Sequence, residues 1–131
     1  MDLNDKKIPK YRTPFRPAVE GLFATIRQER NFRFHLLAAL CACLLGFFFS
    51  LSKTEWIAIL FSIFGVIAME LMNTAIERAV DLTVGHKYHP LAKLAKDAAA
   101  AAVLMWAVLA AIIGCIVFLP KLWHVFQGAA F

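Results

Sequence analysis

The stretch "MELMNTAIERAVDL", Met69 to Leu82, decides how the rest of this chain is interpreted. It directly follows "WIAILFSIFGVIA", residues 56–68, in which no residue is charged. On a helix that turns about 100° per residue, five polar side chains share one face, all within about 60° of the first. This polar stripe consists of Glu70, Asn73, Thr74, Glu77 and Asp81. Because such groups are costly in lipid, the stripe must face other helices or a water-filled cleft.

The composition indicates an integral membrane protein. Hydrophobic residues make up 61% of the 131 positions, against about 45–50% in soluble domains, and they are gathered in blocks. We therefore expect a single all-α membrane domain over residues 1–131. An amphipathic helix at 15–33 would lie in the membrane interface, after a mobile polar arm at 1–14. Three transmembrane helices are expected at 35–52, 56–82 and 98–119.

Local signals suggest where the helices begin and end. Thr54 is a candidate N-cap in the polar turn "SKTE", Gly85 is a candidate helix stop, and Pro90 is a candidate helix start. His35 is interpreted as a helix-end residue at the membrane interface.

The net charge of +5 is unevenly distributed and predicts the orientation. Eight Lys and Arg residues precede the first apolar block, and four more lie in the last turns of the second expected span or in the loop after it. The opposite side has only Lys53 and Lys121, so the positive-inside rule predicts a cytoplasmic N-terminus. A basic arm is also compatible with nucleic acid, but the apolar blocks favour an anionic lipid surface, and no nucleic-acid partner is expected.

The polar stripe carries residue types suited to phosphate chemistry. Mg²⁺ binds one or two carboxylates together with phosphate oxygens, and Glu77 and Asp81 lie toward the cytoplasmic end of the helix. Glu70 lies deepest in the apolar zone, which suits a general base. Two alternatives remain open from the residues alone. The stripe could be a purely structural polar clasp between helices, or it could line a cation path through a small channel or transporter.

Further candidate residues lie on the same expected side. The simplest interpretation of Glu29 is a helix-surface acid paired with Arg33 one turn later. Lys96, beside Asp97, is either a phosphate partner or a lysine that extends along apolar surface toward water. His86 and His89 are spaced as metal ligands can be, but zinc is not expected without a third ligand nearby. The three cysteines, Cys41, Cys43 and Cys115, fit neither a disulfide framework nor a zinc site.

Three segments together resemble one known family. "ELMNTAIERAVDL" closely resembles the signature of the prokaryotic diacylglycerol kinase family, and "ERNFRFH" (29–35) and "AKDAAAAAVL" (95–104) are similar to other family segments. The positions that fill the signature are Glu70, Asn73, Thr74, Ala75, Ile76, Glu77, Val80 and Asp81. Within the family, "ERNFRFH" and "YHPLAKLAKDAAAAAVL" look more like undecaprenol kinases of Gram-positive bacteria than like diacylglycerol kinases.

The resemblance implies an activity and a role for each candidate residue. It implies an MgATP-dependent kinase of a membrane lipid alcohol, undecaprenol or alternatively diacylglycerol. The kinase would lie in the cytoplasmic membrane as a homotrimer with sites at subunit interfaces. Glu70 would be the catalytic base, and Glu29 and Glu77 would hold Mg²⁺, which replaces the simple surface interpretation of Glu29. Asn73 would orient the site and Asp81 would support it. The remaining ATP-binding residues would be Lys87, Tyr88, His89, Lys96 and Asp97.

Overall fold

The computed structural model describes residues 15–85 and 87–128. Four α-helices follow one another in this part of the chain: α1 (Phe15–Gln28), α2 (Arg30–Phe48), α3 (Lys53–Val84) and α4 (Pro90–Phe126). The expected all-α architecture with three long apolar helices is confirmed. The expected mobile arm, residues 1–14, and His86 lie outside the described residues.

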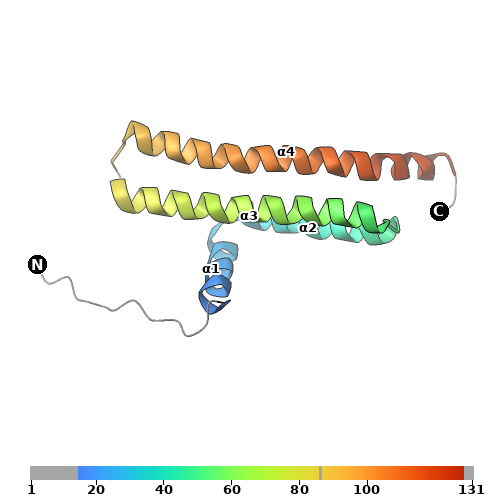
Figure 1. The fold of residues 1–131 in the computed structure, drawn as a ribbon, viewed down its shortest axis with the longest axis horizontal. Helices are drawn as coiled ribbons and strands as arrows, with labels where there is room; N and C mark the ends of the chain where they lie inside the picture. The colour runs from blue at the N-terminus through green and yellow to red at the C-terminus, as the bar shows by residue number, and fades with distance from the viewer. Residues whose placement is uncertain (1–14, 86, 129–131) are drawn as a thin grey trace, which may run out of the picture.

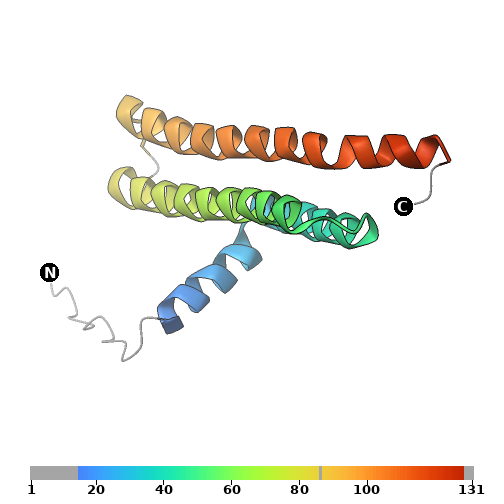
Figure 2. The same ribbon diagram turned by 45° about the vertical axis from the view of Figure 1, so that its right-hand side comes forward.

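The three long helices lie side by side, and α1 leaves them at a steep angle (Figures 1 and 2). α3 contacts each of the other helices, and most of its contact is with α4. The α3–α4 connection and the α2–α3 turn lie at opposite ends of the bundle (Figure 1). This arrangement makes α3, which carries the polar stripe, the helix around which the others are organised.

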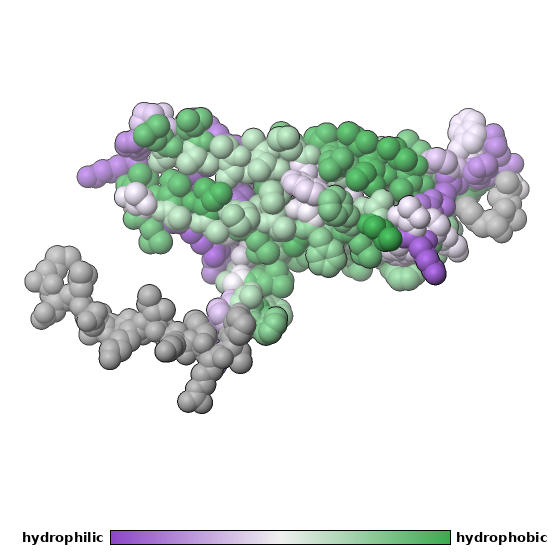
Figure 3. Space-filling model, viewed as in Figure 1, coloured by the Kyte–Doolittle hydropathy of each residue, from purple (hydrophilic) through white to green (hydrophobic). Residues whose placement is uncertain are grey.

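The surface of the bundle has the pattern of a membrane protein. Three helices, α2, α3 and α4, are long and apolar enough to cross a bilayer. Hydrophobic side chains cover the middle of the bundle, and hydrophilic ones gather toward its ends (Figure 3). With 32 residues, α3 is about 48 Å long, well beyond a hydrocarbon core of about 30 Å. The chain is therefore a multi-pass membrane protein whose central helix extends past the apolar zone.

The ends of α3 and α4 are set by local capping groups. α3 begins after Ser52, not at the expected Thr54, because Ser52 and Glu55 form a reciprocal capping box. The Ser52 N–H donates to Glu55 Oε2 at 2.7 Å, and the Glu55 N–H donates to Ser52 Oγ at 3.4 Å. Gly85 ends α3 with a φ of 61°, and Pro90 begins α4, as their sequence positions predict.

The single helix that was expected over 15–33 is interrupted between α1 and α2. Glu29 has an extended backbone (φ −100°, ψ 117°), so α1 ends at Gln28 and α2 begins one residue later. Arg33 stabilises the corner, since its Nη1 donates to the carbonyl oxygen of Arg27 at 3.0 Å. A basic side chain near a helix C-terminus satisfies carbonyl groups that have no partner within the helix.

The first expected transmembrane helix, 35–52, ends earlier in the structure than its apolar sequence predicts. α2 ends at Phe48, and the turn that follows places Ser50 in the left-handed region with a φ of 48°. Apolar side chains around this turn form the hydrophobic core of the structure. Its buried members are Phe49, Leu51, Ile59 and Val117, which join the α2–α3 turn to the far part of α4.

Candidate active site

Glu70 points into the bundle and contacts a histidine from another helix. Only 5% of Glu70 is exposed, and Thr74, one turn further along α3, is also buried. Glu70 Oε1 lies 3.1 Å from Nε2 of His35 on α2. His35 is therefore the interhelical partner of a buried acid, a contact that the sequence interpretation of His35 as a helix-end residue did not include.

Asn73 and Glu77 form the next part of the polar stripe. Asn73 Nδ2 donates to Glu77 Oε1 at 3.0 Å. Asn73 Oδ1 is buried and has no hydrogen-bond partner in the part of the chain that the structure describes. Buried polar oxygens are nearly always partnered, so an oxygen like this one marks a position where a ligand can bind.

Glu29 lies at the α1–α2 corner and contacts α3. Its Oε1 is 3.4 Å from Nη2 of Arg78, which also donates to Oε1 of Gln28 at 2.9 Å. The simple sequence interpretation, in which Glu29 pairs with Arg33, is not what the structure contains. Because Arg78 directly follows Glu77, this contact brings the corner beside the polar stripe.

Two ion pairs continue the polar layer at the α3–α4 end. Lys96 Nζ lies 2.6 Å from Asp81 Oδ1, which joins the end of α3 to the start of α4. Asp97 pairs with Lys93 on the same helix. All four side chains are at least partly exposed to solvent. The pairs therefore hold carboxylates and ammonium groups at an accessible surface.

Five of the expected nucleotide-binding residues line one hollow at this end. It has a volume of about 450 Å³ and lies between the end of α3 and the start of α4. Its polar lining includes Asp81, Lys87, Tyr88, His89, Lys96 and Asp97. His89 also caps α4, because its Nδ1 accepts the Leu91 N–H at 3.2 Å. The hollow thus gathers basic and aromatic side chains that suit a nucleotide.

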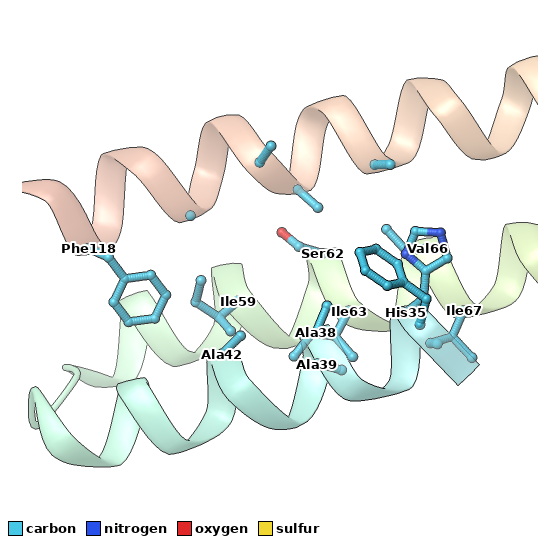
Figure 4. A pocket seen from close by; sticks show the side chains of 15 residues that line it. His35, Ala38, Ala39, Ala42, Ile59, Ser62, Ile63, Val66, Ile67 and Phe118 are labelled. Carbon is cyan, nitrogen blue, oxygen red and sulfur yellow. The ribbon is translucent and has the colours of Figure 1, made fainter. Parts of the chain in front are cut away.

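A second, apolar groove approaches the stripe from within the membrane zone. It has a volume of about 370 Å³ and is lined by α2, α3 and α4. Figure 4 shows His35 toward one end and Phe118 toward the other. Small residues line much of the space between them: Ala38, Ala42, Ala107, Ala110, Ala111 and Gly114. A hydrocarbon chain in this groove would have its polar end beside His35, the partner of Glu70.

The oxygen donors near the stripe fit a magnesium ion shared with a substrate. Within residues 15–85 and 87–128, no group of three or more His, Cys, Asp or Glu side chains can hold a metal ion. Mg²⁺ does not need such a cage, because it binds one or two carboxylates together with phosphate oxygens and water. Asn73 and Glu77, which are bonded to each other, carry oxygen donors of this kind. Glu29, which contacts Arg78 on the same helix, carries another.

Sequence reasoning missed two residues at the site. His35 contacts Glu70, and Arg78 contacts both Gln28 and Glu29. An ionisable residue at the start of an apolar run is rare enough to predict that His35 has a partner, although not which one. Arg78 lies off the polar stripe, at about 80° from Glu70, and nothing in its local sequence distinguishes it from an exposed arginine.

Comparisons with known proteins identify the family. The model of the family "Prokaryotic diacylglycerol kinase" matches residues 16–118. An undecaprenol kinase from Bacillus subtilis is 48% identical over 124 residues, which cover 93% of this chain and 100% of that protein. Diacylglycerol kinases from Synechocystis and Escherichia coli K12 are 39% and 34% identical, covering 87% and 74% of this chain and 65% and 79% of their own lengths. The chain therefore belongs to the prokaryotic diacylglycerol kinase family and is a lipid kinase.

Proposed function

We propose that this chain transfers the γ-phosphoryl group of ATP, with Mg²⁺, to the hydroxyl of undecaprenol. The observation that carries the proposal is the apolar groove that ends at His35, which contacts the buried Glu70. A lipid tail in the groove would bring its hydroxyl toward Glu70, which is the one buried carboxylate in the part of the chain that the structure describes. The polar hollow between α3 and α4 offers a separate approach for a water-soluble nucleotide.

Glu70 is the proposed general base. It accepts the proton of the lipid hydroxyl as the oxygen attacks the γ-phosphorus, while the bond to the β-phosphate oxygen breaks. A base for this step has to lie within about 2.6–3.2 Å of the hydroxyl oxygen. The burial of Glu70 also keeps bulk water, a competing acceptor, away from the reacting phosphoryl group.

Glu29 and Glu77 are the proposed magnesium ligands. When bound, Mg²⁺ offsets the negative charge of the phosphate oxygens during transfer. Asn73 holds Glu77 Oε1 through its Nδ2, and its partnerless Oδ1 is available to the bound nucleotide, its metal ion or a water molecule of that ion. The donor set supports this assignment because it consists of hard oxygen ligands.

The polar hollow is the proposed site for the rest of the nucleotide. Lys96 neutralises phosphate charge. Its contact with Asp81 holds the ammonium group beside the last residue of the polar stripe. Glu70 and Asp81 are eleven positions apart, about 16 Å along the helix. An extended nucleotide is long enough to bridge this distance. Residues assigned to its ribose and base end are Lys87, Tyr88, His89 and Asp97.

The choice of undecaprenol over diacylglycerol rests on sequence similarity. The Bacillus subtilis relative, which matches this chain over nearly its whole length, is named an undecaprenol kinase. The decisive experiment supplies both alcohols in the same mixed micelles with γ-labelled ATP and separates the labelled products by thin-layer chromatography. We expect undecaprenyl phosphate as the main product. A clear preference for diacylglycerol would reject the substrate assignment but keep the lipid kinase.

The proposed assembly is a homotrimer in the cytoplasmic membrane, with the N-terminus in the cytoplasm and α1 in the membrane interface. The trimer rests on the family resemblance, and the orientation on the distribution of Lys and Arg. α1 supports an interfacial position because Phe15, Val19 and Phe23 are exposed on a helix that leaves the bundle. Cross-linking in native membranes tests the trimer. Labelling of single cysteines introduced at either end tests the orientation.

A further inference from the structure

His35 is a residue of the site to which neither the signature motif nor the family match assigns a role. Its Nε2 lies 3.1 Å from Glu70 Oε1, and 21% of the His35 side chain and 7% of the Glu70 side chain are exposed. Among the described residues, His35 is the one side chain that lies within ion-pair distance of this carboxylate. The orientation of Glu70 within the bundle therefore depends on one interhelical contact.

The position of His35 relates that contact to the groove. Among the described residues that line the groove, His35 is the one with an ionisable side chain, while Glu70 is not itself part of the lining. His35 lines the groove together with Val66 and Ile67, which lie about one turn before Glu70 on α3 (Figure 4). His35 thus lies where the head of a lipid in the groove would meet the proposed base.

A carboxylate base needs a fixed orientation to work efficiently. The two oxygens of a carboxylate offer about four acceptor positions, and rotation about the side chain exchanges them unless a partner holds one. Bases of this kind are commonly held by a third group that is hydrogen-bonded to them. With Glu70 Oε1 held 3.1 Å from His35 Nε2, the second oxygen of Glu70 remains for the lipid hydroxyl.

We infer that His35 is a positioning residue, which holds one oxygen of Glu70 so that the other accepts the proton of the lipid hydroxyl. This inference rests on the proposed role of Glu70 but not on the identity of the lipid alcohol. The competing explanation is that the pair merely holds α2 against α3. A structural pair would affect folding, whereas a positioning pair affects turnover at saturating substrate.

The test compares three substitutions in the full chain, purified in mixed micelles. In His35→Gln the side-chain amide reaches far enough to donate to Glu70, in His35→Asn it is one bond too short, and in His35→Leu no donor remains. We expect the Asn and Leu variants to lose about 10- to 100-fold in kcat, as misplacement of a reacting group by about 1 Å does, with KM values for lipid and ATP within about threefold of wild type. The Gln variant should keep at least about a third of the wild-type kcat.

The assay uses whichever of undecaprenol and diacylglycerol the wild-type protein phosphorylates faster, and thermal unfolding is followed in parallel. If the wild type prefers diacylglycerol, the substrate proposal fails and the His35 comparison still stands. Equal kcat values for the Gln and Asn variants would overturn the inference, and so would losses that follow the unfolding temperature. A raised lipid KM with unchanged kcat would also overturn it, because His35 would then bind substrate and not the base. Should the Leu variant not fold, the Gln and Asn variants carry the test.

Discussion

The contact between α3 and α4 at Gly65 gives a quantitative prediction about packing. A Cβ atom added at Gly65 would lie 2.2 Å from Cε3 and Cζ3 of Trp106. Non-bonded carbon atoms prefer about 3.5–4.0 Å, so the indole ring would have to retreat by more than about 1 Å. The ring also packs against Phe61, with centroids 5.3 Å apart, which restricts that movement.

The expected cost of Gly65→Ala follows from two opposing effects. Overpacking a close contact costs about 1–3 kcal/mol, and alanine recovers up to about 1 kcal/mol through its helix propensity. We therefore expect a net loss of about 1–2 kcal/mol in the free energy of unfolding. The loss should disappear when Trp106 is replaced by leucine in the same chain, because the methyl group that Gly65→Ala adds would clash with the indole ring of Trp106.

Titration of the purified protein from mild detergent into sodium dodecyl sulfate, followed by far-ultraviolet circular dichroism, measures this free energy. Gly114→Ala is the matched control, since nothing lies within 4 Å of a Cβ at that position on α4. We expect the control to be neutral or slightly stabilising. Equal unfolding free energies for the two variants would refute the reasoning. Strict additivity of Gly65→Ala and Trp106→Leu would refute it as well.

Three further predictions concern the site. Glu70→Gln should lower kcat by about 10²–10⁴-fold without changing the unfolding temperature, since an amide cannot accept the proton; near-normal transfer of labelled phosphate would disprove the base assignment. Lys96→Met should raise the KM for ATP but shift unfolding by at most about 1 kcal/mol, because its pair with Asp81 is partly exposed, and an unchanged KM would argue against a phosphate contact. Arg78→Ala should speed hydrogen exchange of backbone amides at residues 29–33, with Arg78→Lys intermediate; identical exchange rates would show that Arg78 does not hold the corner.

The polar stripe could be predicted from sequence because its geometry is local. Helical periodicity alone assigns Glu70, Asn73 and Glu77 to one face, and the apolar run before them requires that face to turn away from lipid. The exposure of Asp81 also follows from a local quantity, the length of the helix. A helix about 48 Å long extends beyond the hydrocarbon core, so Asp81, near the end of α3, reaches water.

The partner of Glu70 could not be predicted in the same way. His35 and Glu70 lie on different helices, 35 positions apart, and their contact depends on the register in which α2 packs against α3. That register is set by many side chains together, among them the apolar residues around the α2–α3 turn. No short pattern in "ERNFRFH" encodes it. The contact of Arg78 with the α1–α2 corner could not be predicted for the same reason.

The corner at Glu29 shows how tertiary contacts change the surroundings of a residue that the sequence presents as a simple helix-surface acid. The sequence around it has no glycine or proline, and its amphipathic pattern predicts an uninterrupted helix over 15–33. In a continuous helix, Glu29 would face the side chain of Arg33. The break instead makes Glu29 the N-cap of α2 with no side-chain capping bond. Arg33 is then bonded to the carbonyl groups of α1, and Arg78 draws the Glu29 carboxylate toward α3.

The contacts at this corner fix the position of Glu29 but add little to the free energy of unfolding. The bond from Arg78 to Glu29 is long, at 3.4 Å, and both side chains are partly exposed, so the pair contributes at most about 1 kcal/mol. A weak pair of this kind holds Glu29 against α3 without binding it so tightly that the proposed magnesium ion could not compete. A buried, bidentate pair would stabilise the corner more, but it would remove the carboxylate from the site. The modest contact is therefore compatible with the proposed role of Glu29 as a magnesium ligand.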